Sequence, residues 1–197
     1  MKKELDLGKE KIGKLLLAFS VPCIISMIIN TIYNIVDQIF IGKGVGIIGN
    51  AATNVIFPIV IICNALAGLV GNGAAANLSL RLGEGKKDEA KKSIGSSITL
   101  LFIISILVVI IFELLLPNLV YAFGCTKNVY SSAMTYGRII VFGSFFMIIY
   151  SGLSQIIRAD GSPKYSMICL LVGAILNIIL DPIFIFTFNM GVAGGAI

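Results

Sequence analysis

Residues 94–120 read IGSSITLLFIISILVVIIFELLLPNLV and contain a single charged residue, Glu113. This run is longer than the roughly 20 residues that a helix needs to cross the hydrocarbon core of a bilayer. Four further apolar runs lie near 15–41, 54–80, 136–157 and 166–188. The sequence therefore predicts five membrane spans, and the residues from about 190 predict the start of a sixth helix that is truncated at residue 197.

The composition agrees with a membrane protein. Hydrophobic residues make up 57% of the chain and charged residues only 13%, whereas soluble domains carry about 25% charged residues. Because unpaired backbone groups are costly in lipid, a span must be a helix or part of a closed barrel. The runs lack the alternating pattern of barrel strands. We therefore expect an all-α, polytopic transmembrane helix bundle.

Several function classes are excluded or disfavoured. The chain has no histidine, so catalysis by histidine and metal binding through histidine are excluded. The cysteines lack CxxC or other metal spacing and are interpreted as small apolar filler: Cys23, Cys63, Cys125 and Cys169. No GxxxxGK[ST] pattern is present. The net charge is +5, but the basic residues do not form a continuous stripe of the kind that binds nucleic acid. We expect no enzyme, no cofactor, no certain metal site and no nucleic-acid partner.

The orientation follows from the distribution of Lys and Arg, which favour cytoplasmic loops. The N-terminal segment and the linker between the second and third spans each carry five, whereas the linker after the first span carries only Lys43. This asymmetry predicts a cytoplasmic N-terminus, with the ends near 42–53 and 117–135 facing outward. The charged N-terminus lacks a small-residue cleavage site and is interpreted as retained.

Two aspartates lie inside apolar spans. Asp37 has Tyr33 four residues and Asn30 seven residues before it, so we expect these three residues on one helix face. Asn177 precedes Asp181 by four residues. An ionised carboxylate inside a bilayer is costly and normally faces a bundle interior or a wet cavity. Both aspartates fall in the predicted outer half, where they could share one cavity that coordinates a cation or holds a proton.

Structural explanations remain open for these polar residues. The aspartates could instead pair helices through hydrogen bonds, and Asp37 could reach the outer interface. Glu113 lies near the end of its span without obvious polar partners on its own face, which favours a structural role at the interface. Pro182 directly follows Asp181, and it removes a backbone donor and disturbs the carbonyl one turn back, near Ile178. The glycines of the second span are interpreted as a packing face: Gly68, Gly71 and Gly73.

Four motifs in order resemble the MATE (multidrug and toxic compound extrusion) transporters, over essentially the whole chain. The first is PCIISMIINTIYNIVDQIFIG at 22–42, and the second is GLVGNG at 68–73 followed by RLGEG at 81–85. The third and fourth are IRADGSPK at 157–164 and NIILDP at 177–182. Each motif alone is a weak signal, but their order and spacing together are specific.

The resemblance implies a twelve-helix protein of two lobes, in which residues 1–197 form the N-terminal lobe: five full helices and the start of a sixth. It implies a cation or proton site at Asp37, Asn177 and Asp181, with Tyr33 nearby. Asn30 and Gln155 match positions that are often polar in the family and are candidate cavity-lining residues. The implied partners are the lipid bilayer, small organic drugs and the missing C-terminal lobe.

Three functions are compatible with this pattern. The leading hypothesis is a secondary-active multidrug efflux transporter of the plasma membrane, which exchanges Na⁺ or H⁺ for organic, often cationic, drugs by alternating access. A lipid-linked oligosaccharide flippase would require a basic cavity, and the only basic residues near a span interior are Arg138 and Arg158. A non-transporting scaffold or receptor would tolerate replacement of Asp37 and Asp181.

Overall fold

The molecule is a bundle of five long helices. The computed structural model describes residues 12–196, and this range contains no strand. In chain order the helices are α1 (Ile12–Gly44), α2 (Ile47–Gly83), α3 (Lys87–Ala122), α4 (Lys127–Ala159) and α5 (Pro163–Pro182). A π-helical turn, η1 (Ile183–Thr187), and a 3-10 turn, η2 (Gly191–Ala193), follow. The predicted all-α fold class is confirmed.

The five helices are long and apolar enough to cross a membrane, the fifth with η1 included. Within the described range, the first four predicted spans fall inside α1 to α4. The fifth, 166–188, is not one regular helix, because α5 ends at Pro182 and η1 continues it. Where a sixth helix was predicted to start, near 190, the described residues form only the 3-10 turn η2. The predicted retained N-terminal segment falls mainly on residues 1–11, outside the described range.

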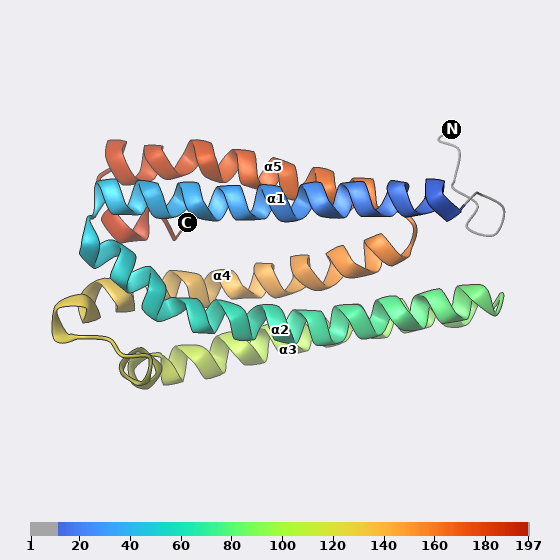
Figure 1. The fold of residues 1–197 in the computed structure, drawn as a ribbon. Coiled ribbons are helices and arrows are strands. Elements are labelled where there is room, and N and C mark those ends of the chain that lie inside the picture. The colour runs from blue at the N-terminus through green and yellow to red at the C-terminus, as the bar shows by residue number, and fades with distance from the viewer. Residues whose placement is uncertain (1–11, 197) are drawn as a thin grey trace.

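The helices form two groups, as Figure 1 shows. α1 and α5 lie side by side in one group, and α2, α3 and α4 pack together in the other. The most extensive packing joins α2 to α4, whereas α1 has few contacts with α2. The hydrophobic core is therefore concentrated in the three-helix group, and a less tightly packed region separates α1 from α2.

A close backbone approach holds α2 against α4. A Cβ atom added to Gly71 would lie 2.8 Å from the carbonyl oxygen of Gly152, and one on Gly152 would collide with Leu101 of α3. The packing role predicted for Gly71 is thus confirmed. The same prediction is wrong for Gly73, because a Cβ atom there would meet nothing within 4 Å.

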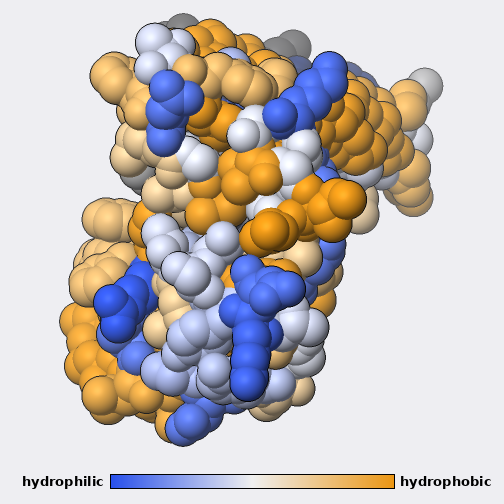
Figure 2. Space-filling view, turned by 90° about the vertical axis from the view of Figure 1, so that its left-hand side faces the viewer, coloured by the Kyte–Doolittle hydropathy of each residue, from blue (hydrophilic) through white to orange (hydrophobic). Residues whose placement is uncertain are grey.

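The outer surface is apolar, as expected of helices in lipid. Large hydrophobic side chains point outward from every helix, for example Leu114, Phe142 and Phe146, which are 74%, 65% and 72% exposed. Figure 2 views the end of the bundle where α1 meets α2 and α3 meets α4, and hydrophilic residues lie there among hydrophobic ones. Exposed apolar area on this scale indicates a lipid environment for the helix sides.

Pro182 marks the end of regular α-helix in α5. Proline lacks the N–H that would bond to the carbonyl one turn earlier, and the five residues after it form the π-helical turn η1. This turn brings Ile185 so close to Gly44 that no side chain would fit at position 44. The irregular turn therefore begins after Pro182, at the junction of α1 with α5, and not near Ile178, where the disturbance was predicted and α5 remains α-helical.

Candidate functional site

The two intramembrane aspartates meet between α1 and α5. Asp37 lies on α1, and Asp181 lies in the last turn of α5. Their carboxyl groups lie close enough to interact electrostatically. Asp181 is only 2% exposed and Asp37 is half-buried. The packing of α1 against α5 thus brings together two carboxylates that are 144 positions apart in the chain.

Asn177 completes the arrangement on α5. Its side-chain amide donates a hydrogen bond of 3.0 Å to Asp181 Oδ1. Each of these three residues has one buried side-chain oxygen without a hydrogen-bond partner among the described residues: Asp37 Oδ1, Asp181 Oδ2 and Asn177 Oδ1. Buried polar atoms are normally satisfied, so this cluster of oxygens has unused capacity for a proton or a cation.

Tyr33 lies one helical turn before Asp37 and borders a separate opening. A cavity of about 380 Å³ lies between α1 and α5, with Tyr33 and Asn177 on its wall. Tyr150 of α4 and Cys169 of α5 also line it. The cavity therefore approaches the carboxylate pair from the Asn177 side.

Two residues near the carboxylate pair were missed from the sequence. Tyr136 of α4 is 8% exposed and lies within electrostatic range of Asp37 and Asp181. Gly195, beyond η2, lies against α1, since a Cβ atom there would be 2.8 Å from Ile41 and 3.5 Å from Asp37 Oδ1. Tyr136 lies at the start of the fourth apolar run with one polar neighbour at helical spacing, Ser132 four residues before it, which is too weak a local signal to mark it.

Within residues 12–196, no cationic side chain forms an ion pair with either carboxylate. None of the ion pairs between residues 12–196 includes Asp37 or Asp181. Two carboxylates in contact cannot both be ionised without a nearby positive charge or a shared proton. The arrangement is therefore chemically suited to take up a proton or a small cation.

Asn30 and Gln155 lie apart from the carboxylate pair. The side chain of Asn30 accepts a hydrogen bond of 2.8 Å from Asn34, and it lines a cavity of about 900 Å³ between α1 and α2. Gln155 lines another cavity, of about 700 Å³, with Asn64 and Asn72. Asn30 thus lines the cavity between α1 and α2, whereas Tyr33 lines the cavity between α1 and α5. The expected common face of Asn30, Tyr33 and Asp37 therefore does not border a single cavity.

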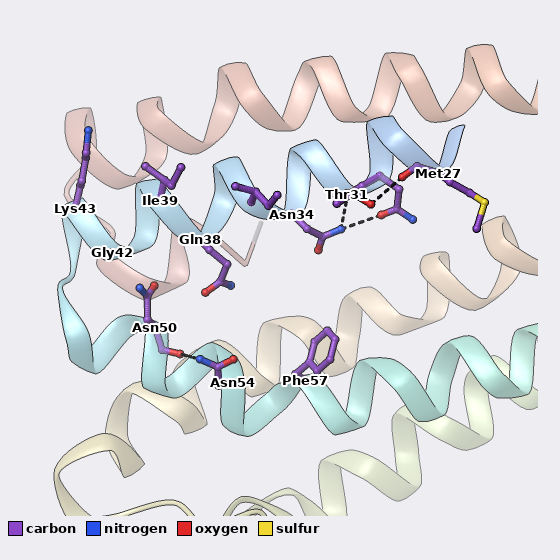
Figure 3. Close-up of a pocket in the computed structure, with 12 residues that line it drawn as sticks. Met27, Thr31, Asn34, Gln38, Ile39, Gly42, Lys43, Asn50, Asn54 and Phe57 are labelled. Atoms are coloured by element: carbon purple, nitrogen blue, oxygen red, sulfur yellow. Dashed lines mark hydrogen bonds between the residues drawn. The ribbon is translucent and has the colours of Figure 1, made fainter. Parts of the chain in front are cut away.

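The α1–α2 cavity is rich in amide side chains, as Figure 3 shows. Asn34 and Gln38 project from α1 toward Asn50 and Asn54 of α2. Gln38 also accepts a hydrogen bond of 3.2 Å from Thr53 on α2. The spacing of Asn30, Asn34 and Gln38, four residues apart in a membrane span, is a sequence signal that could have identified this wall.

Polar contacts hold three further charged residues of the helices: Glu113, Arg138 and Arg158. Glu113 of α3 forms an ion pair with Arg138 of α4, with 3.4 Å between Oε1 and Nε. The partner of Glu113 comes from the neighbouring helix, which is why its own helix face lacks one. Arg158 donates hydrogen bonds to the carbonyl and the hydroxyl of Ser154.

Comparisons with known proteins agree with the fold and with the motifs. The MatE family model matches residues 22–183. The chain belongs to the MatE family. It is 32% identical over 191 residues to the multidrug export protein MepA of Staphylococcus aureus (strain NCTC 8325 / PS 47), covering 96% of this chain and 42% of that protein.

Solved MATE structures share the architecture. The MATE multidrug transporter DinF-BH, solved in complex with a ligand, is 38% identical with a TM-score of 0.92, covering 100% of this chain and 44% of that one. A MOP superfamily transporter from Pyrococcus furiosus, in which reverse polarity of the binding pocket suggests a different function, is 28% identical with a TM-score of 0.91, over 100% and 43%. The chain thus spans less than half the length of these relatives.

Proposed function

We propose that this chain forms the N-terminal lobe of a secondary-active multidrug efflux transporter, which exchanges Na⁺ or H⁺ for organic drugs by alternating access. The carboxylate pair, Asp37 with Asp181, is the coupling site, and Asn177 and Tyr33 support it. The observation that carries this proposal is the pair itself. Its two carboxylates meet in an apolar bundle. Among residues 12–196, one buried oxygen of each carboxylate and the side-chain oxygen of Asn177 have no hydrogen-bond partner, and neither carboxylate has a cationic partner.

The coupling follows from electrostatics. Without a bound proton or cation, the two carboxylates repel each other and weaken the contact between α1 and α5. Binding of H⁺ or Na⁺ removes this repulsion, so it stabilises the conformation in which the helices are packed together. A ligand shifts a conformational equilibrium by its difference in affinity for the two states, and the α1–α5 contact supplies that difference.

The drug is expected to use the amide-lined cavity. MepA is a multidrug export protein and DinF-BH is a MATE multidrug transporter, which supports a role in drug export. The cavity of about 900 Å³ combines Asn34, Gln38 and Asn54 with apolar residues such as Met27 and Phe57. Apolar walls with a few polar groups suit chemically varied organic molecules.

The flippase alternative is not favoured. It would need a basic cavity inside the bundle for a pyrophosphate group, whereas Arg138 is 63% exposed on the surface of α4 and Arg158 is held by Ser154. The reverse-polarity relative from Pyrococcus furiosus illustrates that function varies within the superfamily. Here the buried charge at the α1–α5 contact is acidic, which favours cation coupling.

The proposed transporter lies in the plasma membrane with its N-terminus in the cytoplasm. This orientation rests on the Lys and Arg asymmetry of the linkers. It directs the α1–α2 and α3–α4 connections outward. The carboxylate pair, which lies toward the same end of α1 and α5, then belongs to the outer half of the membrane.

The proposal is tested by drug efflux in vesicles that contain the protein as the cell produces it. Na⁺ and pH gradients are imposed separately, and the transport of a fluorescent organic cation is followed. Asp37→Asn and Asp181→Asn are expected to reduce gradient-driven efflux to near background, because each removes one of the paired charges. The gradient that drives the wild-type protein identifies the coupling ion.

Asp160→Asn provides the matched control. Asp160 is an exposed carboxylate at the α4–α5 turn, so its loss is expected to leave efflux unchanged. If the Asp37 and Asp181 variants are well folded and retain full gradient-driven efflux, the coupling site is assigned incorrectly. A wild-type protein that responds to neither gradient would overturn secondary-active transport.

A further inference from the structure

A further polar pocket lies on the outer side of α4, away from the carboxylate pair. It has a volume of about 590 Å³ and is lined by residues from one face of the first turns of α4. Its polar members are Tyr130, Ser131, Thr135 and Arg138. None of the four is acidic, and Tyr130, Ser131 and Arg138 offer hydrogen-bond donors, whereas the Thr135 hydroxyl already donates to the carbonyl of Ser131. The lining therefore favours an anion.

Arg138 retains unused hydrogen-bonding capacity in this pocket. Its guanidinium is 63% exposed and uses only Nε in the ion pair with Glu113. Within the described range, its two terminal amino groups and the hydroxyls of Tyr130 and Ser131 have no hydrogen-bond partner. A guanidinium with two free amino groups matches the geometry of a phosphate group.

The pocket lies at the depth of the lipid head groups. With 33 residues, α4 is about 50 Å long at 1.5 Å per residue, so it extends roughly 10 Å beyond a 30 Å hydrocarbon core at each end. The long side chain of Arg138 reaches toward the polar boundary from about three turns inside the helix. Tyr130 stacks on Tyr121 with 4.9 Å between ring centroids, and tyrosine is typical of this boundary.

An apolar surface for acyl chains continues from the pocket. Phe142 and Phe146 follow Arg138 on the outward face of α4 and are 65% and 72% exposed. Phe145 links them to α3, since its ring lies 5.1 Å from that of Phe146 and 5.9 Å from that of Phe102. A polar pocket beside an exposed aromatic strip suits a phospholipid, whose phosphate group is polar and whose acyl chains are apolar.

We propose that the Arg138 pocket binds the phosphate group of a membrane phospholipid, with an acyl chain along Phe142 and Phe146. Glu113 holds Nε and so orients the guanidinium with its two amino groups outward. This site is separate from the carboxylate pair and does not depend on the proposed transport function. The bound lipid is a structural ligand that anchors the α3–α4 end at the interface.

The test is native mass spectrometry of the protein as the cell produces it, titrated with phosphatidylglycerol. Arg138→Gln is expected to weaken binding of the first lipid about five- to tenfold, the effect of one cation near a lipid phosphate. Lys127→Gln removes a positive charge at the same end of α4 but outside the pocket. This control is expected to leave the affinity unchanged.

Three further arms distinguish the explanations. A galactolipid without phosphate is expected to bind equally to wild-type and Arg138→Gln protein. Inorganic phosphate at the same concentrations is expected not to displace the lipid, whereas displacement would indicate a free-anion site and overturn the lipid assignment. Glu113→Gln keeps the guanidinium and removes a negative charge, so it is expected to retain or strengthen lipid binding.

Equal lipid affinity in wild type and Arg138→Gln would overturn the proposal. Arg138→Lys, which keeps the charge, is the second variant if Arg138→Gln fails to fold, and it is expected to bind more weakly than wild type because lysine lacks the paired amino groups. The proposal would also be overturned if Arg138→Lys kept the wild-type lipid affinity and Lys127→Gln lost as much affinity as Arg138→Gln. That result would mean that lipid binds through the general surface charge and not in this pocket.

Discussion

The side-chain amide of Asn177 donates a 3.0 Å hydrogen bond to Oδ1 of Asp181, one turn further along α5. This bond fixes the orientation of a carboxylate that is 2% exposed, and it leaves Oδ2 available at the contact with α1. The side-chain oxygen of Asn177 is itself buried without a partner among the described residues. Asn177 therefore combines a positioning role toward Asp181 with an available oxygen of its own.

Asn177→Ala is expected to change coupling-ion binding without abolishing it, in a direction that depends on the ion. The change removes the hydrogen bond that orients Asp181 and an available oxygen, so the affinity for Na⁺ is expected to fall roughly tenfold or more, whereas the affinity for H⁺ is expected to rise, because the lost bond favoured the ionised carboxylate. The concentration of the coupling ion that gives half-maximal efflux measures this effect. Asn118→Ala is the matched control, because Asn118 is an asparagine of α3 that lies away from the carboxylate pair. An unchanged half-maximal concentration in Asn177→Ala would contradict the positioning role.

The glycine contact between α2 and α4 allows a paired stability test. Gly71→Ala is expected to destabilise the protein by about 1–3 kcal/mol, as for other overpacked cores, because its Cβ would lie 2.8 Å from the Gly152 carbonyl oxygen. Gly73→Ala is expected to be neutral or slightly stabilising, since its Cβ meets nothing within 4 Å and alanine favours helix. Thermal unfolding in detergent measures both. Equal midpoints for the two variants would show that the α2–α4 approach tolerates a methyl group.

Cys125 reports the orientation of the chain in the membrane. It lies in the connection between α3 and α4, whereas the other three cysteines lie within helices. With a cytoplasmic N-terminus, a membrane-impermeant maleimide is expected to label Cys125 from outside in intact cells. Cys125→Ser should abolish this labelling. Labelling only after permeabilisation would reverse the proposed orientation.

The same cysteine has a defined pH dependence. Burial raises the pKa of the Cys125 thiol, and the thiolate is the reactive form. A raised pKa leaves less thiolate at neutral pH, so labelling is expected to be slower than for a fully exposed cysteine. The rate is expected to keep rising above about pH 8.5, the ordinary value for cysteine. A rate that levels off below that pH would contradict the shift.

The helices and the candidate site differ in how far they could be predicted. Membrane spans are local, because a run such as 94–120 must bury its backbone polarity wherever it lies in lipid. Asp37 and Asp181 are also recognisable locally, since a carboxylate in an apolar run is costly. The end of α5 was harder to predict, because apolar composition continues through 183–187 although Pro182 has removed the backbone donor.

The sequence by itself determined the number and approximate position of the five described spans, because each follows from the free energy of one segment in a bilayer. Only the tertiary structure decided which polar residues share a cavity. In the folded chain, Asp37 lies beside Asp181 because α1 packs against α5, and Tyr136 of α4 lies near both. Asn30 instead faces the α1–α2 cavity. The physical reason is that helix packing depends on side-chain shape across segments far apart in the chain, which no local pattern contains.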